Sequence, residues 1–414
     1  MRNPIDPRFR MTVGIEDTFV IQEGPGARSL EEYELTQHYA NWRGDLMLAA
    51  ESGATSIRYG LPWYRVNPER GKFEWDWADE VIDTLVDSGL EVILDLVHYG
   101  TPEWLEDGFA HPEYPERIAE YASALAERYG DRVAAWTPLN EPQWTARLCG
   151  ESATWPPGLS GDAGYVTIMA SICRGISLTQ AAVTAASSQK PTFVHVEASF
   201  RYDRERGVES AEADLLELRR FLALDLLTGR VTSAHPLVDY LVSNGLAEAD
   251  LEWFRAHPAI PDILGVNYYP MWSTFNYSVG ADGIRGTERD DGIDGLVDVL
   301  RTYSARYDLP VMITETSFEG SVAQQVEWLE ESVAAINTLR DDVPVVGYTW
   351  WPFFDQVKWQ YREGTEPVED YLHHLGLVSL TPDDDGSLRR TKTEAFRVFK
   401  TLALAERSEC DPAS

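Results

Sequence analysis

Short apolar runs recur along the chain and alternate with stretches of helical spacing. The runs predict eight strands, at residues 9–15, 54–63, 90–100, 132–142, 191–199, 262–270, 310–318 and 344–353. Several of them are almost continuously apolar, as parallel strands covered on both faces must be. Between the runs, apolar residues recur at helical spacing over 37–52, 76–88, 114–129, 165–188, 212–227, 292–307 and 321–340.

This alternation predicts an α/β fold, a single (β/α)8 barrel. The competing fold is a doubly wound open sheet, but no glycine-rich phosphate loop follows the first strand. Because no repeat, low-complexity tract or linker interrupts the pattern, we expect one barrel domain over residues 1–414. Its last few residues are expected to form a disordered tail.

Charge and cysteine content narrow the class of protein. The chain has 68 acidic and 35 basic side chains, a net charge of −33, which argues against nucleic acid or an anionic membrane as a partner. The acidic surface also fits adaptation to high salt. The N-terminus lacks the apolar core of a signal peptide, and no apolar run approaches the ~20 residues of a membrane helix. Three cysteines without CxxC spacing predict reduced thiols rather than disulfides or a zinc site, so we expect a cytoplasmic protein.

Polar residues cluster where the expected strands end, which is where barrel enzymes carry their active sites. Carboxylates, amides, a histidine and aromatic rings there suit sugars, which have polar edges and apolar faces. These residues are Glu16, Asp17, Arg58, His98, Asn140, Glu141, His195, Glu197, Asn267, Tyr268, Tyr269, Glu315, Trp350 and Trp351.

Two of these carboxylates, Glu141 and Glu315, end the fourth and seventh expected strands, on facing sides of a barrel mouth. A pair of this kind can cleave a glycosidic bond, one as acid and the other as nucleophile or base. In so acidic a chain most glutamates are solvated surface charge. Two that each end a buried strand favour the catalytic interpretation.

The stretch "TPLNEP" (137–142) resembles the Asn-Glu-Pro acid/base motif of glycoside hydrolase family 1, whose clan of barrel glycosidases carries the nucleophile on strand seven. Further segments resemble that family in the same order, from about residue 33 to about residue 380. They are "SIRYGLPWYRVNPERGKFEWD" (56–76), "LVHYGTPEWL" (96–105), "GVNYYP" (265–270) and "GYTWWPFFDQVKW" (347–359).

The resemblance implies a retaining β-glycosidase that hydrolyses β-O-glycosidic bonds by double displacement, acts on the end of a small glycoside and needs no cofactor. Glu141 would be the acid/base and Glu315 the nucleophile, with carboxyl groups ~5–5.5 Å apart. Burial near Glu315 would raise the pKa of Glu141. The supporting residues implied by the matched segments are Arg58 pairing with Glu315, Asn140 at the sugar 2-OH, His98 at a ring hydroxyl, Tyr269 donating to Glu315, Trp351 under the sugar, and Asn267 and Trp359.

The chain departs from the family pattern at several positions. Tyr99 stands where a tryptophan normally follows the histidine, and "ETS" replaces Glu-Asn-Gly at the nucleophile. Gln22 is the nearest match to the sugar-binding glutamine, but its spacing from Gly14 is one residue too long. Glu16 and Asp17 are therefore alternative site groups on the first strand.

Lys358 is the departure that bears on the substrate, because β-glucosidases and β-galactosidases of the family have a glutamate there for the outer hydroxyls of the sugar. Either the glycone is anionic, or Lys358 pairs with Glu16 or Asp17. We expect a small carbohydrate or glycoside as the partner molecule, and a homo-oligomer stays open. A transglycosidase with the same two glutamates is an alternative. A carbohydrate-binding pseudoenzyme is disfavoured because Glu141, Glu315, Arg58 and Asn140 are all present.

Overall fold

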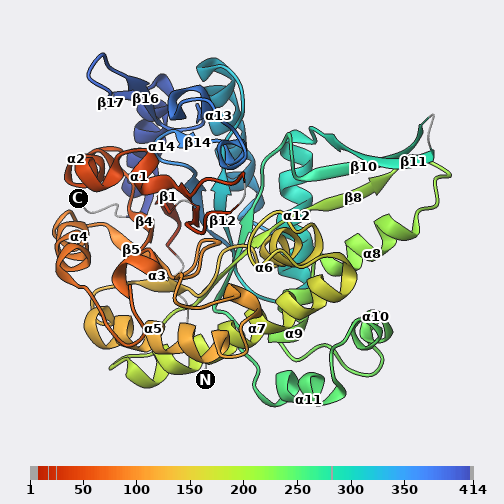
Figure 1. The fold of residues 1–414 in the computed structure, drawn as a ribbon. Helices are drawn as coiled ribbons and strands as arrows, with labels where there is room; N and C mark the ends of the chain where they lie inside the picture. The colour runs from red at the N-terminus through yellow and green to blue at the C-terminus, as the bar shows by residue number, and fades with distance from the viewer. Residues whose placement is uncertain (1–7, 17, 25, 281–282, 411–414) are drawn as a thin grey trace.

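The computed structural model describes residues 8–16, 18–24, 26–280 and 283–410, so the expected C-terminal tail lies outside the described residues. Eight parallel strands form its centre (Figure 1). They run in the order β6-β5-β4-β1-β13-β12-β9-β7, and parallel bridges Trp136–Phe193 and Asn140–Val196 join the outermost two. The predicted (β/α)8 barrel is therefore confirmed.

Each predicted strand segment contains one barrel strand, and the observed strands are shorter than the apolar runs. Their bounds are β1 (Arg10–Ile15), β4 (Ser56–Gly60), β5 (Glu91–Asp95), β6 (Ala135–Thr137), β7 (Val194–Ala198), β9 (Ile263–Asn267), β12 (Val311–Thr316) and β13 (Val345–Trp350).

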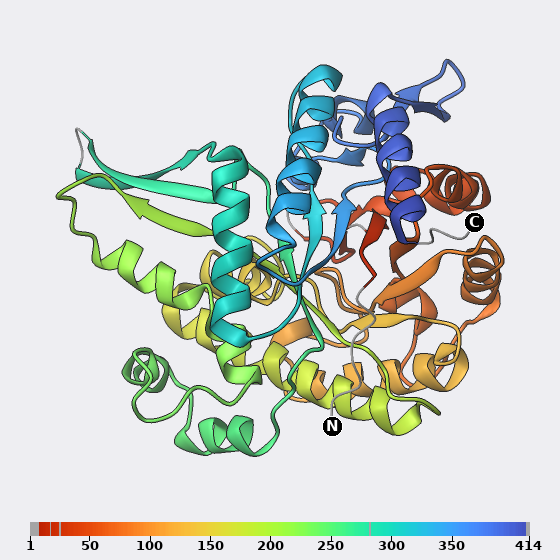
Figure 2. The ribbon, with the colours of Figure 1, turned by 180° about the vertical axis from the view of Figure 1, so that it is seen from behind.

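Helices surround the strands, as the view from behind shows most clearly (Figure 2). Those that match a prediction are α2 (His38–Glu51), α4 (Asp76–Asp87), α5 (Tyr114–Tyr129), α7 (Gly161–Ala186), α12 (Gly292–Tyr307) and α13 (Val322–Leu339). The single helix expected over 212–227 is wrong, because the chain breaks at 220–221 into α8 (Ala211–Arg219) and α9 (Leu222–Leu227). The other described α-helices are α1 (Glu32–Leu35), α3 (Trp63–Val66), α6 (Pro142–Ala146), α10 (Val238–Ser243), α11 (Glu248–Ala256) and α14 (Glu394–Cys410).

The barrel interior has its own apolar core, separate from the larger core between strands and helices. It consists of Ile93, Ala135, Val194, Val196, Ile263, Met312 and Val346. Because side chains alternate along a strand, Val194 and Val196 place His195 and Glu197 of β7 on the opposite face, toward the helices. This orientation matters below, because Glu197 is a strand-end carboxylate that does not enter the barrel mouth.

A second sheet lies beyond the carboxyl ends of β7 and β9 and projects from one side of the barrel (Figures 1 and 2). Its strands are β8 (Arg201–Arg204), β10 (Thr274–Gly280) and β11 (Gly283–Arg289), with β10 in the middle. The sequence did not predict it, because every residue of β11 is exposed and leaves no apolar alternation to detect. The remaining strands, all short, are β2 (Phe19–Val20), β3 (Leu30–Glu31), β14 (Gln356–Val357), β15 (Leu372–His373), β16 (Val378–Pro382) and β17 (Leu388–Lys392).

Helix α7 is long and apolar enough to cross a bilayer by composition, and it is the one helix among the described residues that is. Just over half of its most apolar stretch, 56%, is nevertheless buried inside the protein, and the helix packs along α5. These contacts are those of a core helix of the barrel.

Candidate active site

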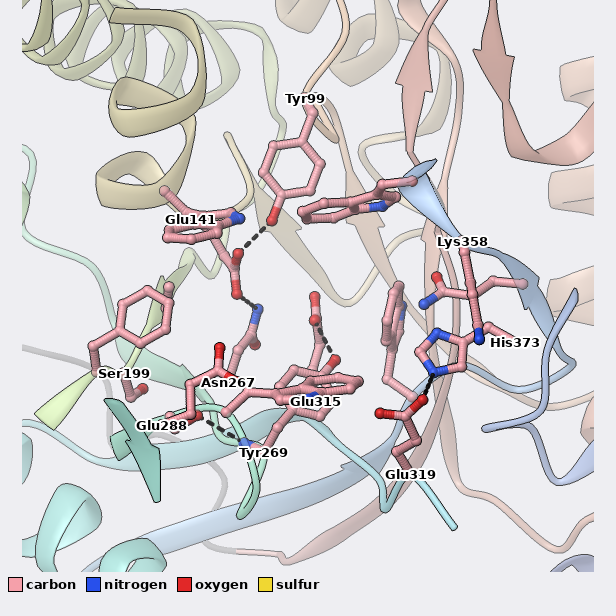
Figure 3. Close-up of a pocket in the computed structure, with 18 of the residues that line it drawn as sticks. Tyr99, Glu141, Ser199, Asn267, Tyr269, Glu288, Glu315, Glu319, Lys358 and His373 are labelled. Atoms are coloured by element: carbon pink, nitrogen blue, oxygen red, sulfur yellow. Dashed lines mark hydrogen bonds and ion pairs between the residues drawn. The ribbon is translucent and has the colours of Figure 1, made fainter. Parts of the chain in front are cut away.

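A cavity of about 450 Å³ opens at the carboxyl ends of the barrel strands (Figure 3). Figure 3 shows the carboxylates of Glu141 and Glu315 pointing into it, with Lys358, His373 and Glu319 to one side and Ser199 and Glu288 to the other. Its lining residues include most of the predicted site: His98, Glu141, Asn267, Tyr269, Glu315, Trp351, Lys358 and Trp359.

Glu141 stands between the end of β6 and the first turn of α6, in a left-handed backbone conformation (φ 45°, ψ 67°). A residue other than glycine adopts this conformation at a cost of roughly 1–3 kcal/mol, so the surroundings must hold it. The Glu141 N–H donates to the Val196 carbonyl at 3.0 Å, and the Thr145 N–H donates back to the Glu141 carbonyl at 2.8 Å.

The Glu141 side chain is only 7% exposed and meets neutral donors. The Tyr99 hydroxyl donates to Oε2, and Asn267 Nδ2 donates to Oε1 at 2.8 Å. Burial and then the neighbouring Glu315 carboxylate raise the pKa of Glu141 to about 8, against the lowering effect of the two donors. The surroundings of Glu141 therefore favour its protonated form.

Glu315 lies in β12 and is 3% exposed. Its environment differs from that of Glu141, because Arg58 Nη1 donates to Oε1 at 2.6 Å and the Tyr269 hydroxyl donates to Oε2 at 2.8 Å. The two glutamates thus face one cavity with different partners.

Arg58 is fully buried and binds more groups than the sequence suggested. Besides Glu315 it pairs with Glu16 Oε1 at 2.9 Å and Asp95 Oδ2 at 2.7 Å. It also donates to Asn140 Oδ1 at 2.7 Å. Burial acts to lower the pKa of Arg58, but the three carboxylates outweigh it and raise the pKa above its ordinary value.

His98 and Trp351 form one wall of the cavity, with ring planes 14° apart and centroids 6.1 Å apart. His98 Nδ1 lies 3.1 Å from Asp95 Oδ2. Its other ring nitrogen, Nε2, is 3.3 Å from Asn140 Nδ2. Asp95 thus orients both His98 and Arg58, although the sequence reasoning missed it. Its position as the last residue of β5 was the available signal.

Of the first-strand candidates, Glu16 and Gln22 do not line the cavity. Glu16 pairs with Arg58, and Gln22 Nε2 donates to the Thr101 carbonyl at 2.8 Å. Asp17 lies outside the described residues. Trp359, in contrast, borders the cavity and donates through Nε1 to Thr18 Oγ1 at 3.0 Å.

Lys358 contributes a cationic side chain to the cavity wall. Glu16 is engaged by Arg58, and within the described part of the chain no carboxylate lies within ion-pair distance of Lys358 Nζ. Nearby, His373 Nε2 lies 3.1 Å from Glu319 Oε1. Burial and the Lys358 charge lower the pKa of His373, while Glu319 acts to raise it.

The opposite side of the cavity is aromatic and was not predicted. Trp144 of α6 contacts Phe200 at a centroid distance of 5.1 Å, and Phe200 contacts Phe275 of β10 at 5.8 Å. Glu288 of β11 borders the same side. These residues come from α6, from the loop after β7 and from the second sheet, so a search for polar residues at the ends of the barrel strands could not find them.

Residues 13–226, a little over half of the chain, match the model of glycosyl hydrolase family 1. The chain therefore belongs to this family, which confirms the resemblance seen in its motifs. It is 25% identical to the aryl-phospho-β-D-glucosidase BglC of Bacillus subtilis, over 88% of this chain and 86% of the relative. It is 26% identical to the thermostable β-glucosidase B of Thermobispora bispora, over 94% and 85%.

The fold has solved counterparts. The β-glucosidase of Thermotoga maritima in complex with azafagomine superposes with a TM-score of 0.80, at 19% identity over 96% of this chain and 98% of that one. Family, relatives and fold together define a β-glucosidase-like glycoside hydrolase with a (β/α)8 barrel. Among the described residues, no group of three or more His, Cys, Asp or Glu side chains could hold a metal ion.

The raised pKa of Glu141 makes a prediction about stability. The ordinary value of a glutamate is 4.5, so between about pH 4.5 and 8 the folded protein keeps a proton that the unfolded chain releases. This contribution to the free energy of unfolding is present below pH 4.5 and is lost as pH rises through 8. Because glutamine does not titrate, Glu141→Gln should become progressively more stable relative to the parent across this window and then level off.

Denaturant unfolding at a series of pH values from 4 to 9 measures this difference. Glu319→Gln, at a half-exposed carboxylate on the same cavity, serves as the control and should show a much smaller pH-dependent difference. If the difference in free energy of unfolding between Glu141→Gln and the parent is constant with pH, the pKa of Glu141 is the same in the folded and unfolded states.

Proposed function

We propose that the protein is a retaining, exo-acting β-glycosidase in which Glu315 is the nucleophile and Glu141 the acid/base. The observation that carries the proposal is one cavity into which both Glu141, whose surroundings raise its pKa, and an Arg58-bound Glu315 point. Retention by double displacement needs one carboxyl group that can donate a proton and one that can attack the sugar, ~5–5.5 Å apart.

In the first step Glu315 attacks the anomeric carbon while Glu141 gives its proton to the departing glycosidic oxygen. Arg58 and Tyr269 hold the two Glu315 oxygens in place for attack. Forming the ester removes the negative charge of Glu315, which is the second-largest cause of the raised pKa of Glu141. The pKa of Glu141 then falls, so Glu141 changes from acid to base and can deprotonate the water that releases the sugar.

The remaining predicted residues fit around this step as positions for the sugar. We assign Asn140, which Arg58 holds next to His98 below the cavity lining, to the sugar 2-OH, and Trp351, which lines the cavity, to the apolar face of the sugar. The two carboxyl groups supply acid, base and nucleophile, so the reaction needs no metal or organic cofactor. A small glycoside suits a cavity of about 450 Å³.

The glycone, in this proposal, carries an anionic group. This proposal is supported by Lys358, which lines the cavity and has no carboxylate within ion-pair distance among the described residues, of which Asp17 is not one. His373 stands next to it and would be protonated more readily beside an anion. A bacterial relative named as an aryl-phospho-β-glucosidase supports the idea that a charged glycone is compatible with this scaffold.

The aromatic side of the cavity then receives the aglycone. Trp144, Phe200 and Phe275 offer ring faces, which favour a small apolar or aromatic group over an extended sugar chain. The net charge of −33 also disfavours long anionic polymers as substrates, because the protein surface would repel them.

Substitution of the two glutamates tests the assignment. Glu141→Ala should lower kcat/KM by about 10²–10⁴-fold on glycosides with poor leaving groups. The first step should survive on dinitrophenyl glycosides, which depart without protonation. Azide should restore turnover of Glu141→Ala as a β-glycosyl azide, and of Glu315→Ala as an α-glycosyl azide.

The parent enzyme provides the complementary evidence. NMR of the first product should show the β anomer, whereas an α anomer would contradict retention. Transfer to added sugars in place of water would identify a transglycosidase. Absence of turnover on all glycosides would instead favour a binding protein.

Substrate comparison and substitution of Lys358 test whether the glycone is anionic. The parent should hydrolyse nitrophenyl β-glucuronide or a 6-phosphorylated glucoside in preference to glucoside, galactoside and fucoside. Lys358→Met should lower kcat/KM for the charged glycone by about 10–100-fold, because a hydrogen bond to a charged group contributes roughly 1.5–3 kcal/mol. Neutral glycosides should be hydrolysed nearly as before. Lys190→Met, at an exposed lysine paired with Asp262, is the control, and an equal preference for neutral glycones would refute the anionic proposal.

A further inference from the structure

Glu197 is a strand-end carboxylate for which the mechanism above has no use. It lies in β7, is 1% exposed and does not line the cavity. Val194 and Val196 of the same strand fill the barrel, so Glu197 points the other way, into the layer between strands and helices. It therefore cannot touch a substrate.

A carboxylate in this layer is costly unless its oxygens are satisfied. Glu197 Oε2 accepts no hydrogen bond from the described residues, and its nearest cationic candidate, His195 Nε2, is 3.4 Å away. An apolar side chain would fill the same space without this penalty. The incomplete pairing therefore suggests that the carboxylate serves something other than stability.

The other oxygen shows what it serves. Glu197 Oε1 accepts from the Gln143 N–H and from its own neighbour, the Ala198 N–H, both at 3.1 Å. Gln143 lies two residues beyond Glu141, and the Glu141 N–H is bound to the Val196 carbonyl. The left-handed Glu141 backbone is thus held from both sides by β7, at residues 196 and 197.

Glu197 also acts on Glu141 through its charge. After burial and Glu315, it is a further cause of the raised pKa of Glu141. The other titratable groups that face Glu197 are Tyr165 and Cys173 on α7 and Tyr303 on α12, together with His195 on its own strand. Burial raises the pKa of both tyrosines and of Cys173, so none of these three is charged at neutral pH.

We infer that Glu197 is a positioning residue for Glu141: its carboxyl group anchors the backbone that aims Glu141 into the cavity and acts on the Glu141 side chain from the helix-facing side of β7. The inference rests on the proposed role of Glu141 as acid/base. In this inference, a residue on the helix-facing side of β7 affects catalysis without contacting the substrate.

Two conservative variants distinguish the hydrogen bond that Glu197 accepts from the Gln143 N–H, the anchor, from the effect of its charge on Glu141. Glu197→Gln keeps an oxygen for the two N–H groups and removes the charge. The alkaline limb of the kcat/KM pH profile should then move down by about 0.5–1 pH unit, as expected for loss of a neighbouring like charge. Glu197→Asp keeps the charge but is one methylene too short to reach Gln143. It should leave the limb in place and lower kcat about tenfold on poor leaving groups, with little effect on dinitrophenyl glycosides.

Two further variants serve as comparisons. Tyr99→Phe removes a donor that lowers the pKa of Glu141, so it should move the same limb in the opposite direction. Asp45→Asn alters an equally buried carboxylate on α2, whose partners are His38 and Arg390. It can lower stability but should leave the limb unmoved.

The outcome is decided by variants shown to be folded by circular dichroism and thermal unfolding. An unmoved alkaline limb in Glu197→Gln, or an equal movement in Asp45→Asn, would overturn the charge role. Unchanged kcat on poor leaving groups in Glu197→Asp would overturn the anchor. If Glu197→Gln does not fold, the Glu197→Asp result still decides the anchor.

Failure of the proposed function can be told apart from failure of the Glu197 inference. If Glu141 is not the acid/base, Glu141→Ala alone will leave the dependence of kcat on the leaving group unchanged. If Glu141 is the acid/base, adding Glu197→Gln to Glu141→Ala should not alter that dependence further.

Discussion

The carboxyl end of the barrel is organised by one buried guanidinium. Arg58 of β4 binds Glu16 after β1, Asp95 of β5, Asn140 after β6 and Glu315 of β12. Five of the eight strands are therefore tied together at the level where the cavity begins. Buried ion pairs add little net stability, because desolvation offsets their attraction. Their consequence here is geometric, since each partner of Arg58 has its place fixed relative to the others.

This arrangement leaves the two glutamates of the cavity in different surroundings. Glu315 receives the cation, whereas Glu141 receives only the neutral donors Tyr99 and Asn267. Arg58 pairs with three carboxylates, and Glu141 is not one of them. Two identical side chains can therefore take different roles at one cavity, because only one of them contacts the guanidinium.

The sequence predicted the parts of this protein that follow from burial and strand direction. Buried parallel strands are almost continuously apolar, so all eight were found, and their polar ends led to Glu141, Glu315 and Arg58. The second sheet escaped because β11 is exposed throughout. Asp95 was missed because the apolar run predicted a strand over residues 90–100, whereas β5 ends at Asp95. Lys358 was recognised as a departure, but only the structure shows that Glu16 is already engaged by Arg58.

Glu197 shows that a polar residue at the carboxyl end of a barrel strand need not line the active site. That rule treats every polar residue at the carboxyl end of a strand as a candidate for substrate contact. A strand has two faces, however, and residue 197 differs from residue 196 by one position and hence by a half-turn of the side chain. A residue on the outer face can still act on the chemistry when the loop above it bends back over the strand, as the Glu141–Gln143 segment does over β7. In this barrel the groups that hold Glu141 lie partly among the helices, while Lys358 and the aromatic side of the cavity lie on segments outside the eight barrel strands. Substrate preference can therefore change through those segments without disturbing the two glutamates.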